Sequence, residues 1–292
     1  IPGTRVTNSI TLAFCSIPSL RWPSLKKSVR TIKFPGEMIL LGTGTSVGVP
    51  SLGCACPVCI SGDPRNHRTR CSAILGLPEG NLLLDTSPDM RQQLLREGIG
   101  LVHAVAYTHE HADHIFGMDD LRLFQFYLGH PVPIFCEPFV EQRLRKSFDY
   151  AFSDIKPTHP GAAPSLEFHP IALEPFHALG AEITPIRLHH GPRFKVLGFR
   201  VGNVAYCTDC NEIPSESQSK LEGLDTLILD GLRHRPHVTH FTVEQAVAMA
   251  EKLGAKQTYL THCSCDLDYE STNSELPPHI QLAHDGQRIP LT

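Results

Sequence analysis

Thr108-His109-Glu110-His111-Ala112-Asp113-His114 is the stretch from which the rest of the chain can be interpreted. It follows the apolar run 101–107, which predicts a buried strand. Where that strand opens into a loop, His109 and His111 point to one side. Asp113 and His114 begin the next turn and face a neighbouring point. The spacing therefore predicts that this single run binds two adjacent metal ions.

The side-chain types suit several metals. Neutral imidazole and carboxylate groups bind zinc and also manganese or iron, so the pattern indicates a metal site without fixing the element. The alternative is a solvated loop in a chain that is rich in histidine, with 17 in total. We favour metal because two metal-type pairs of side chains within one turn are rare by chance.

Three later strand ends carry the same kinds of side chain. A predicted strand over residues 183–188 runs into His190, a predicted hairpin ends at Asp209, and a predicted strand over residues 257–261 ends at His262. Strand ends that deliver His and then Asp are what a dinuclear site needs. We expect Asp209 to bridge the two ions.

Three thiols, those of Cys54, Cys56 and Cys59, lie within six residues, a spacing that suits tetrahedral zinc. A fourth ligand has to come from elsewhere in the chain. The alternatives are a redox-active Cys-x-x-Cys pair or ordinary free thiols. We favour structural zinc because redox pairs usually open a helix after a strand, whereas this pair lies in a loop rich in proline and glycine.

Residues 1–37 differ in composition from the rest. They hold six basic residues and one acidic residue, many serines and threonines, and no convincing amphipathic period. This composition is typical of a transit peptide. The interpretation that we favour slightly is an over-long gene model, since Met38 stands directly before an apolar run. In either case we expect residues 1–37 to lie outside the folded core and residues 38–292 to form one domain.

The overall composition, with 41% hydrophobic and 19% charged residues, is ordinary for a soluble globular protein. No apolar run approaches the roughly 18 residues of a membrane span. The chain has 26 basic and 30 acidic residues, so residues 38–292 keep 20 and 29, a net charge of −9. This acidity disfavours long nucleic acids as partners, whereas a small anion held by metal remains compatible.

The ten cysteines lie mostly in close pairs, and no apolar signal sequence precedes them. Close pairs next to histidines indicate metal binding and a reducing compartment, not a disulfide scaffold. We expect a cytoplasmic protein, or an organellar one if residues 1–37 are a transit peptide.

The pattern His-x-His-x-Asp-His after a strand resembles the signature of the metallo-β-lactamase superfamily. This resemblance implies an α/β fold, the four-layer αββα sandwich, with a dinuclear metal site along one edge. It implies no particular substrate.

Within that superfamily, the chain most resembles the PhnP family of cyclic-phosphate phosphodiesterases, from Met38 to Leu291. The metal motif and the Cys-rich loop carry this resemblance together. Further matching segments are Gly42-Thr-Gly44, Val49-Pro50, Leu260-Thr-His262 and Asp285-Gly286.

The resemblance also implies which residues act as ligands. One ion would be held by His109, His111 and His190, and the other by Asp113, His114 and His262, with Asp209 shared. Cys265, three residues after the last metal histidine, would close a structural zinc site with Cys54, Cys56 and Cys59. One member of the PhnP family has His at the position of Cys265, and cysteine serves equally well as a zinc ligand.

Three further roles follow from the same resemblance. Asp85 matches an Asp that supports the metal loop by hydrogen bonds. His240 aligns with the histidine that acts on the phosphate. We expect His240 and Asp113 to be the catalytic side chains.

A more distant resemblance is to RNase Z, through His240-Phe241-Thr242 before a predicted helix. RNase Z generally grips tRNA with an arm inserted between the positions of His190 and Asp209. Only 18 residues separate those positions here, which leaves no room for an arm. This difference weighs against tRNA as the substrate.

We therefore expect a metal-dependent hydrolase of small phosphodiesters, with cyclic sugar phosphates as one candidate class. It would use a hydroxide that bridges two zinc or manganese ions. A glyoxalase-type thioesterase or lactonase, an RNase Z-like nuclease and a non-catalytic metal-binding protein are the alternatives. The expected partner is a small substrate and not a membrane, and a homodimer is left open.

Overall fold

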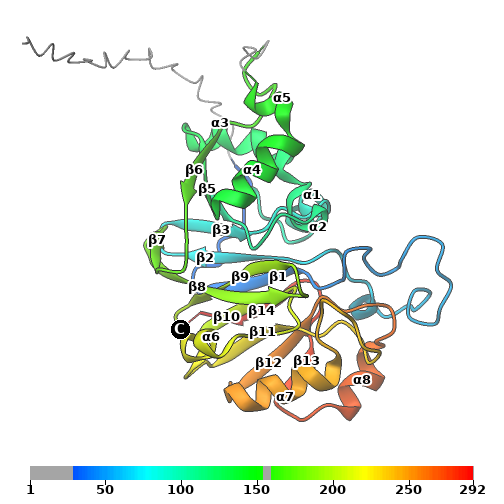
Figure 1. Cartoon of the computed structure of the whole chain (residues 1–292). Coiled ribbons are helices and arrows are strands. Elements are labelled where there is room, and N and C mark those ends of the chain that lie inside the picture. The colour runs from blue at the N-terminus through cyan, green and yellow to red at the C-terminus, as the bar shows by residue number, and fades with distance from the viewer. Residues whose placement is uncertain (1–28, 154–158, 292) are drawn as a thin grey trace, which may run out of the picture.

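Two mixed β-sheets, packed face to face, form the centre of the computed structural model, which describes residues 29–153 and 159–291 (Figure 1). The first sheet contains, in spatial order, β14 (Gln287–Pro290), β1 (Glu37–Gly42), β2 (Ser72–Leu77), β3 (Gly80–Leu84), β4 (Ala104–Ala106), β5 (Val132–Cys136) and β6 (Leu166–Pro170). The second contains β13 (Ile280–Leu282), β12 (Gln257–Thr261), β11 (Thr226–Asp230), β10 (Val204–Cys207), β9 (Phe194–Val201), β8 (Ala181–His190) and β7 (Phe176–Ala178).

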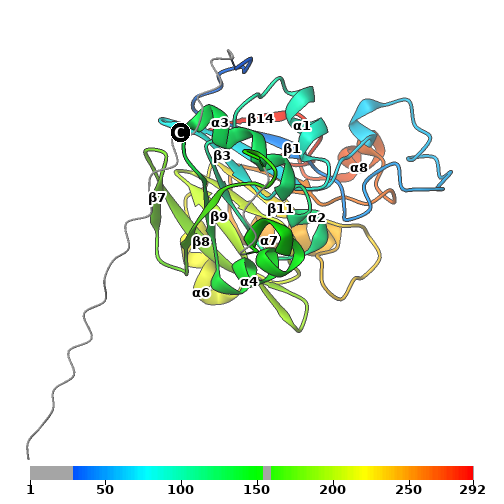
Figure 2. The same cartoon turned by 90° about the horizontal axis from the view of Figure 1, so that it is seen from above.

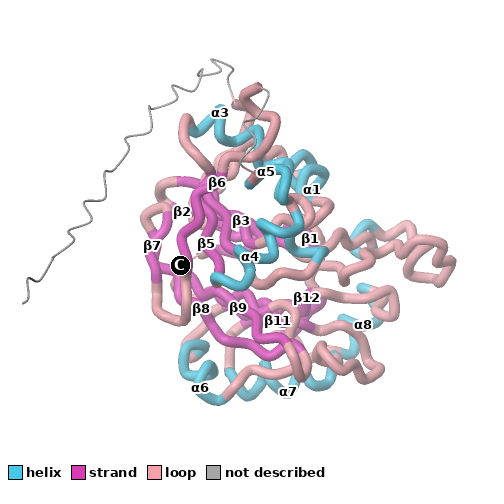
Figure 3. The backbone as a smooth tube through the Cα atoms, turned by 45° about the horizontal axis from the view of Figure 1, so that its top comes forward, coloured by secondary structure: helices cyan, strands magenta, loops and turns pink. Residues whose placement is uncertain are grey.

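Helices cover the outer face of each sheet, so that the tube in Figure 3 shows them on both sides of the strands. On the first sheet these are α1 (Met90–Arg96), α2 (Ala112–Ile115), α3 (Phe124–Leu128), α4 (Pro138–Ser147) and α5 (Asp149–Phe152). On the second they are α6 (Ser215–Gln218), α7 (Val243–Leu253) and α8 (Tyr269–Glu275). None of the helices in the described ranges is long and apolar enough to cross a lipid bilayer.

The period of the strands explains this layering. Ile39 and Leu41 of β1 pack toward the helices, whereas Leu40, which points to the other face, lies in the cluster between the sheets. Ile228 of β11 joins that same cluster from the second sheet. Because alternate side chains of a strand point to opposite faces, a strand that is apolar at every position is buried on both sides. The predicted αββα sandwich is confirmed.

One edge of the sandwich collects the carboxyl ends of parallel strands. In the first sheet β3, β4 and β5 are parallel, and in the second β10, β11 and β12 are parallel. Ligands bind beyond the carboxyl ends of parallel strands because the strand-to-helix loops gather there. The residues at or just after these ends are Asp85, Thr108, Asp209, Asp230 and His262.

The loop over residues 43–71 carries the clustered cysteines and extends from the body of the molecule (Figure 1). It lies beside α8, as Figure 2 shows from above. Asn66 fixes this contact, since its Nδ2 donates to Asp268 Oδ2 at 2.8 Å and its Oδ1 accepts from the backbone N–H of Tyr269 at 2.9 Å. The loop is therefore anchored to the C-terminal part of the chain.

The boundary predicted at Met38 is wrong for the part of the N-terminal segment that the structure describes. Phe34 is 4% exposed and belongs to the cluster between the first sheet and its helices. The backbone N–H groups of Ile32 and Gly36 donate to the carbonyls of Gly98 and Gly76. The core therefore begins several residues before β1, and residues 1–28 lie outside the described part.

Candidate metal centre

Seven side chains meet at the strand-end edge, and each offers one ligand atom. The first ligand group is His109, His111, His190 and Asp209, whose ligand atoms lie within 4.8 Å of one another. The second ligand group meets the same limit and is Asp113, His114, Asp209 and His262. Asp209 belongs to both groups. The structure thus brings together all seven residues that the sequence proposed as active-site ligands.

The first ligand group joins the two sheets. His109 and His111 follow β4 of the first sheet, whereas His190 ends β8 and Asp209 follows β10 of the second. His109 Nε2 lies 3.0 Å from His111 Nδ1 and 3.8 Å from Asp209 Oδ2. Thr239 accepts from His190 Nδ1 through its backbone carbonyl at 2.8 Å, which leaves Nε2 of that ring available to a ligand.

The second ligand group holds buried nitrogens that point at carboxylate oxygens. His114 Nε2 lies 3.3 Å from Asp209 Oδ2 and 3.4 Å from Asp113 Oδ2. His262 Nε2 lies 3.4 Å from Asp209 Oδ2. Neither nitrogen has a hydrogen-bond partner among the described residues, although both are buried. Buried polar atoms normally have a partner, so this cluster has the form of a ligand set that converges on a cation.

The donor set fits divalent metal. Imidazole nitrogen with carboxylate oxygen suits zinc, manganese or iron, and a carboxylate shared between two groups is the usual bridge of a two-metal site. Such ligands have to be neutral imidazoles and charged carboxylates. Burial holds the pKa of His109 well below its usual value. Burial alone would raise the pKa of Asp209, but the electrostatic influence of the neighbouring His262 and His114 outweighs it and holds that pKa well below its usual value.

Asp85 fixes the metal loop from behind. Its Oδ1 accepts from the backbone N–H of Thr108 at 2.8 Å, and its Oδ2 accepts from Thr108 Oγ1 at 2.7 Å. The same Oδ2 accepts from His114 Nδ1 at 2.7 Å. This bond sets the tautomer of His114 so that Nε2 is free to bind metal, which is how outer carboxylates commonly orient metal-binding histidines.

Backbone strain marks the same site. Asp85, Asp209 and His262 have φ values of 63°, 53° and 58°. Each follows a parallel strand, and residues other than glycine rarely adopt positive φ. Left-handed residues of this kind cost roughly 1–3 kcal/mol each and persist where the surroundings fix them, often at functional sites. The sharp turn sends each side chain toward the shared edge.

His240 lies beside the ligand groups. Its ring is 4.5 Å from that of His262 and 4.7 Å from that of His190, measured between centroids. Its Nδ1 lies 2.6 Å from Oδ2 of the buried Asp230, which also accepts from the backbone N–H of Cys210. Burial alone would lower the pKa of His240, but Asp230 outweighs it and raises that pKa to about 9. His240 Nε2 can therefore present a proton at neutral pH.

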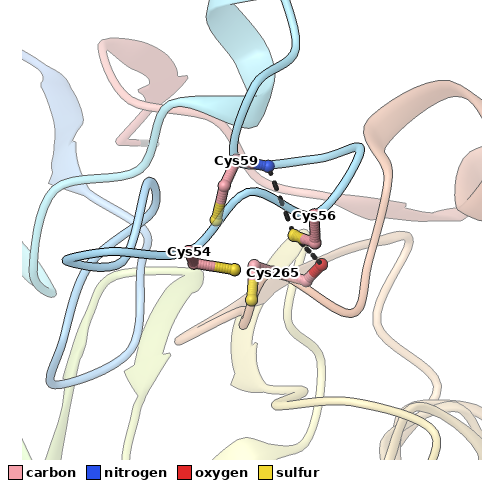
Figure 4. Close-up of side chains that lie close together, drawn as sticks. All are labelled: Cys54, Cys56, Cys59 and Cys265. Atoms are coloured by element: carbon pink, nitrogen blue, oxygen red, sulfur yellow. Dashed lines mark hydrogen bonds between the residues drawn. The ribbon is translucent and has the colours of Figure 1, made fainter.

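A separate thiol cluster lies in the long loop. Cys54, Cys56 and Cys59 meet Cys265, and their four sulfurs lie within 4.8 Å of one another (Figure 4). The backbone N–H of Cys59 donates to Cys56 Sγ at 3.4 Å, which is the main cause that lowers the pKa of Cys56 to about 7. Four convergent sulfurs and no other ligand type suit tetrahedral zinc.

Comparison with known proteins agrees with this geometry. The sequence model of the β-lactamase superfamily domain matches residues 80–263, which include both ligand groups. The chain belongs to the β-lactamase superfamily. Proteins of this superfamily usually bind divalent metals, and the chain is accordingly a metallo-β-lactamase-fold hydrolase.

Among solved structures of the superfamily, a diphosphatase from the PhnP family is 44% identical, with a TM-score of 0.81 over 87% of this chain and 96% of that one. The predicted likeness to PhnP enzymes is confirmed. Zinc-bound PqqB from Methylobacterium extorquens, at 21% identity and a TM-score of 0.70, covers 87% of this chain and 100% of that one. Human short-form tRNase Z is 18% identical, with a TM-score of 0.62 over 88% of this chain and 99% of that one. At these identities, the likeness to PqqB and to tRNase Z shows a shared fold alone.

One relative that is similar in sequence is named for acyl chemistry and not for phosphate chemistry. An octanoyltransferase from Porphyromonas gingivalis is 38% identical over 252 residues, which are 85% of this chain. The aligned part is 50% of that protein, so the chain spans about half the length of this relative.

Sequence reasoning missed two positioning residues of the site. Asp230, which orients His240, is the last residue of the parallel strand β11. Asp85 and Asp209 likewise lie at or just after the carboxyl ends of parallel strands. That shared pattern of strand-end carboxylates could have revealed it. Thr239, which orients His190, acts through its backbone carbonyl, and no side-chain pattern could have revealed that contact.

Proposed function

We propose that the chain hydrolyses small phosphate esters, at a phosphodiester or a diphosphate linkage, with two divalent ions held by the two ligand groups. The observation that carries this proposal is Asp209, whose carboxylate stands in both groups beside the free Nε2 atoms of His114 and His262. Bound there, zinc or manganese supplies Lewis acidity that lowers the pKa of a water and offsets negative charge on phosphoryl oxygens.

The side chains around the ions have separate tasks. His109, His111 and His190 orient one side of the site, and Asp113, His114 and His262 orient the other. His240 donates a proton from Nε2 to the leaving oxygen, while Asp230 holds its Nδ1. General acid catalysis of this kind typically contributes 10²–10⁴-fold. Asp113 belongs to the second ligand group, and we propose that its carboxylate also contacts the substrate.

The relative most informative about the linkage is the PhnP-family diphosphatase, because its identity to this chain is 44% over nearly its whole length. Its name supports a phosphorus substrate and adds diphosphates to the cyclic sugar phosphates expected from the sequence. A small substrate is consistent with the net charge of −9 over residues 38–292, which disfavours long nucleic acids.

We also propose that the thiol cluster of Cys54, Cys56, Cys59 and Cys265 binds one structural zinc. The cluster joins the long loop to the segment after β12, and it lies with Val49 and Val58 in a small apolar cluster of its own. This region has little other core, so metal binding would contribute directly to its folding.

A second candidate function is hydrolysis of an acyl ester or thioester. The similarity to the octanoyltransferase, whose aligned half covers 85% of this chain, favours an acyl substrate. The same metal ligands would serve at a carbonyl carbon, but a thiolate leaving group needs no proton from His240.

A substrate panel separates these functions. Metal-loaded protein is offered a cyclic phosphodiester, an alkyl diphosphate ester, an octanoyl thioester and a lactone. We expect kcat/KM to be highest for one of the two phosphorus substrates. Faster turnover of the thioester or lactone, with little reaction of either phosphorus substrate, contradicts the proposed function and favours the acyl one.

A further inference from the structure

Phe194 lies beside the two ligand groups, in contact with His111 and His190, although it is neither a candidate ligand nor the proposed proton donor. It is the first residue of β9 and pairs in register with His190, the last residue of β8. Directly paired residues of antiparallel strands place their side chains on the same face. Phe194 therefore faces the metal centre together with His190.

Ring contacts confirm that orientation. The Phe194 ring is 4.8 Å from the His111 ring, at an interplanar angle of 73°, and 6.1 Å from the His190 ring. The residue nevertheless keeps 37% of its surface exposed. One part of the ring thus contacts two candidate ligands of the first ion, and another part faces solvent.

The turn before Phe194 is held in place. Gly191 has φ of 71°, and a Cβ at this position would lie 2.5 Å from Thr239 Cγ2. Thr239 in turn accepts from His190 Nδ1 through its carbonyl. The tip of the hairpin is therefore packed on the loop that leads to His240.

The residue before Phe194 in the chain is Arg193, which is exposed. An exposed aromatic ring beside candidate metal ligands suits a ligand that has both a planar ring and a phosphate, because bases stack on aromatic side chains and the proposed metal ions would bind phosphoryl oxygens.

We propose that Phe194 forms a subsite for a planar ring of the substrate, so that the preferred substrates are nucleotides and not bare sugar phosphates. This inference rests on the proposed function, since the ring would lie beside a phosphoryl group held at the metal centre. Phe194 is then a specificity-determining residue and takes no part in bond cleavage.

Two substrates with the same linkage test this subsite by kinetics. They are the methyl ester of adenosine 5′-diphosphate and that of ribose 5-diphosphate, which differ only in the base. We expect kcat/KM to be about tenfold higher for the adenosine compound, as one stacking contact would give. Phe194→Ala should remove that preference through KM, Phe194→Trp should keep it, and Phe139→Ala on α4 serves as the matched exposed phenylalanine.

Equilibrium binding of AMP and ribose 5-phosphate to the full chain gives a readout independent of turnover. If neither ester is hydrolysed but AMP binds more tightly in a manner that requires Phe194, the proposed function fails and the subsite stands. If hydrolysis proceeds without preference for the base, the subsite is refuted and the function stands. A Phe194→Ala variant that weakens both ligands equally, with metal loss, shows that the ring only supports His111 and also overturns the proposal.

Discussion

His262 and Cys265 are three residues apart in one segment, yet they lie in two different candidate metal clusters. Between them, Cys263 is clamped by the loop after β1. Its backbone N–H donates to the Thr43 carbonyl at 2.9 Å, and its carbonyl accepts from the backbone N–H of Thr45 at 3.3 Å. The segment between the two clusters is thus fixed to the loop after β1 by both backbone groups of Cys263.

The first prediction concerns metal content. Cys265→Ala removes one of four tetrahedral ligands, so the zinc content should fall by about one ion per chain. The melting temperature should fall with it, because the proposed zinc would join the long loop to the C-terminal part. Metal analysis and thermal unfolding of the purified variant measure both effects.

Cys263→Ala is the matched control. Cys263 is fully buried, and its sulfur contacts the Leu260 carbonyl instead of the other thiols. It should keep its full metal content. The assignment of ligands is wrong if Cys263→Ala loses zinc while Cys265→Ala retains it.

The second prediction concerns Asp85. Asp85→Asn replaces a carboxylate that accepts from both Thr108 and His114, so the His114 ring loses the bond that sets its tautomer. Active-site metal affinity should fall by about 10- to 100-fold. Competition with a chelator of known affinity measures it. Asp89→Asn, at a partly exposed ion pair with Arg70, should leave the affinity unchanged.

The third prediction concerns His240. His240→Ala should keep both active-site ions while kcat for a phosphodiester with a poor leaving group falls by about 10²-fold or more. The loss should be smaller with a nitrophenolate leaving group, which needs little protonation. Asp230→Asn should show the same dependence on the leaving group with a smaller loss, because Asp230 acts through His240. Unchanged turnover of the poor-leaving-group substrate in His240→Ala would refute its role as proton donor.

The fourth prediction concerns the start of the core. Deletion of residues 1–37 removes Phe34 from the buried cluster and should lower the melting temperature by about 5 °C or more, since loss of a buried phenylalanine is costly. Deletion of residues 1–28 keeps every contact described here and is the control. Equal melting temperatures for the two deletions would show that Phe34 contributes nothing.

Local sequence patterns were sufficient to predict the candidate ligands where metal-binding residue types stand at the ends of predicted strands. The run from His109 to His114 and the strand ends at Asp209 and His262 predicted one cluster, because parallel strands of one sandwich present their ends at one edge. Cys265 was predicted through the resemblance alone, and the structure brings its sulfur to the other three thiols.

Other features depend on contacts between distant parts of the chain, which local patterns do not encode. The basic composition around Phe34 suggested that this segment lies outside the core. The Phe34 ring nevertheless packs between the first sheet and the helices that cover it. No local pattern singled out Phe194, whose pairing with His190 places it beside the two ligand groups. Pairing register and side-chain packing supply this information.

The Asp209→Asn variant gives the most direct test of the account, through metal content and phosphoester turnover measured on the same sample. Asp209 is the one residue common to both ligand groups. Wild-type protein reconstituted with manganese or zinc should hold two ions besides the structural one, and hydrolysis should rise as they are added. Asp209→Asn should keep the thiol-bound zinc, lose affinity for both other ions, and lose turnover with them. Full turnover of a phosphodiester or diphosphate by Asp209→Asn, or by wild-type protein with only the thiol cluster loaded, would contradict the account.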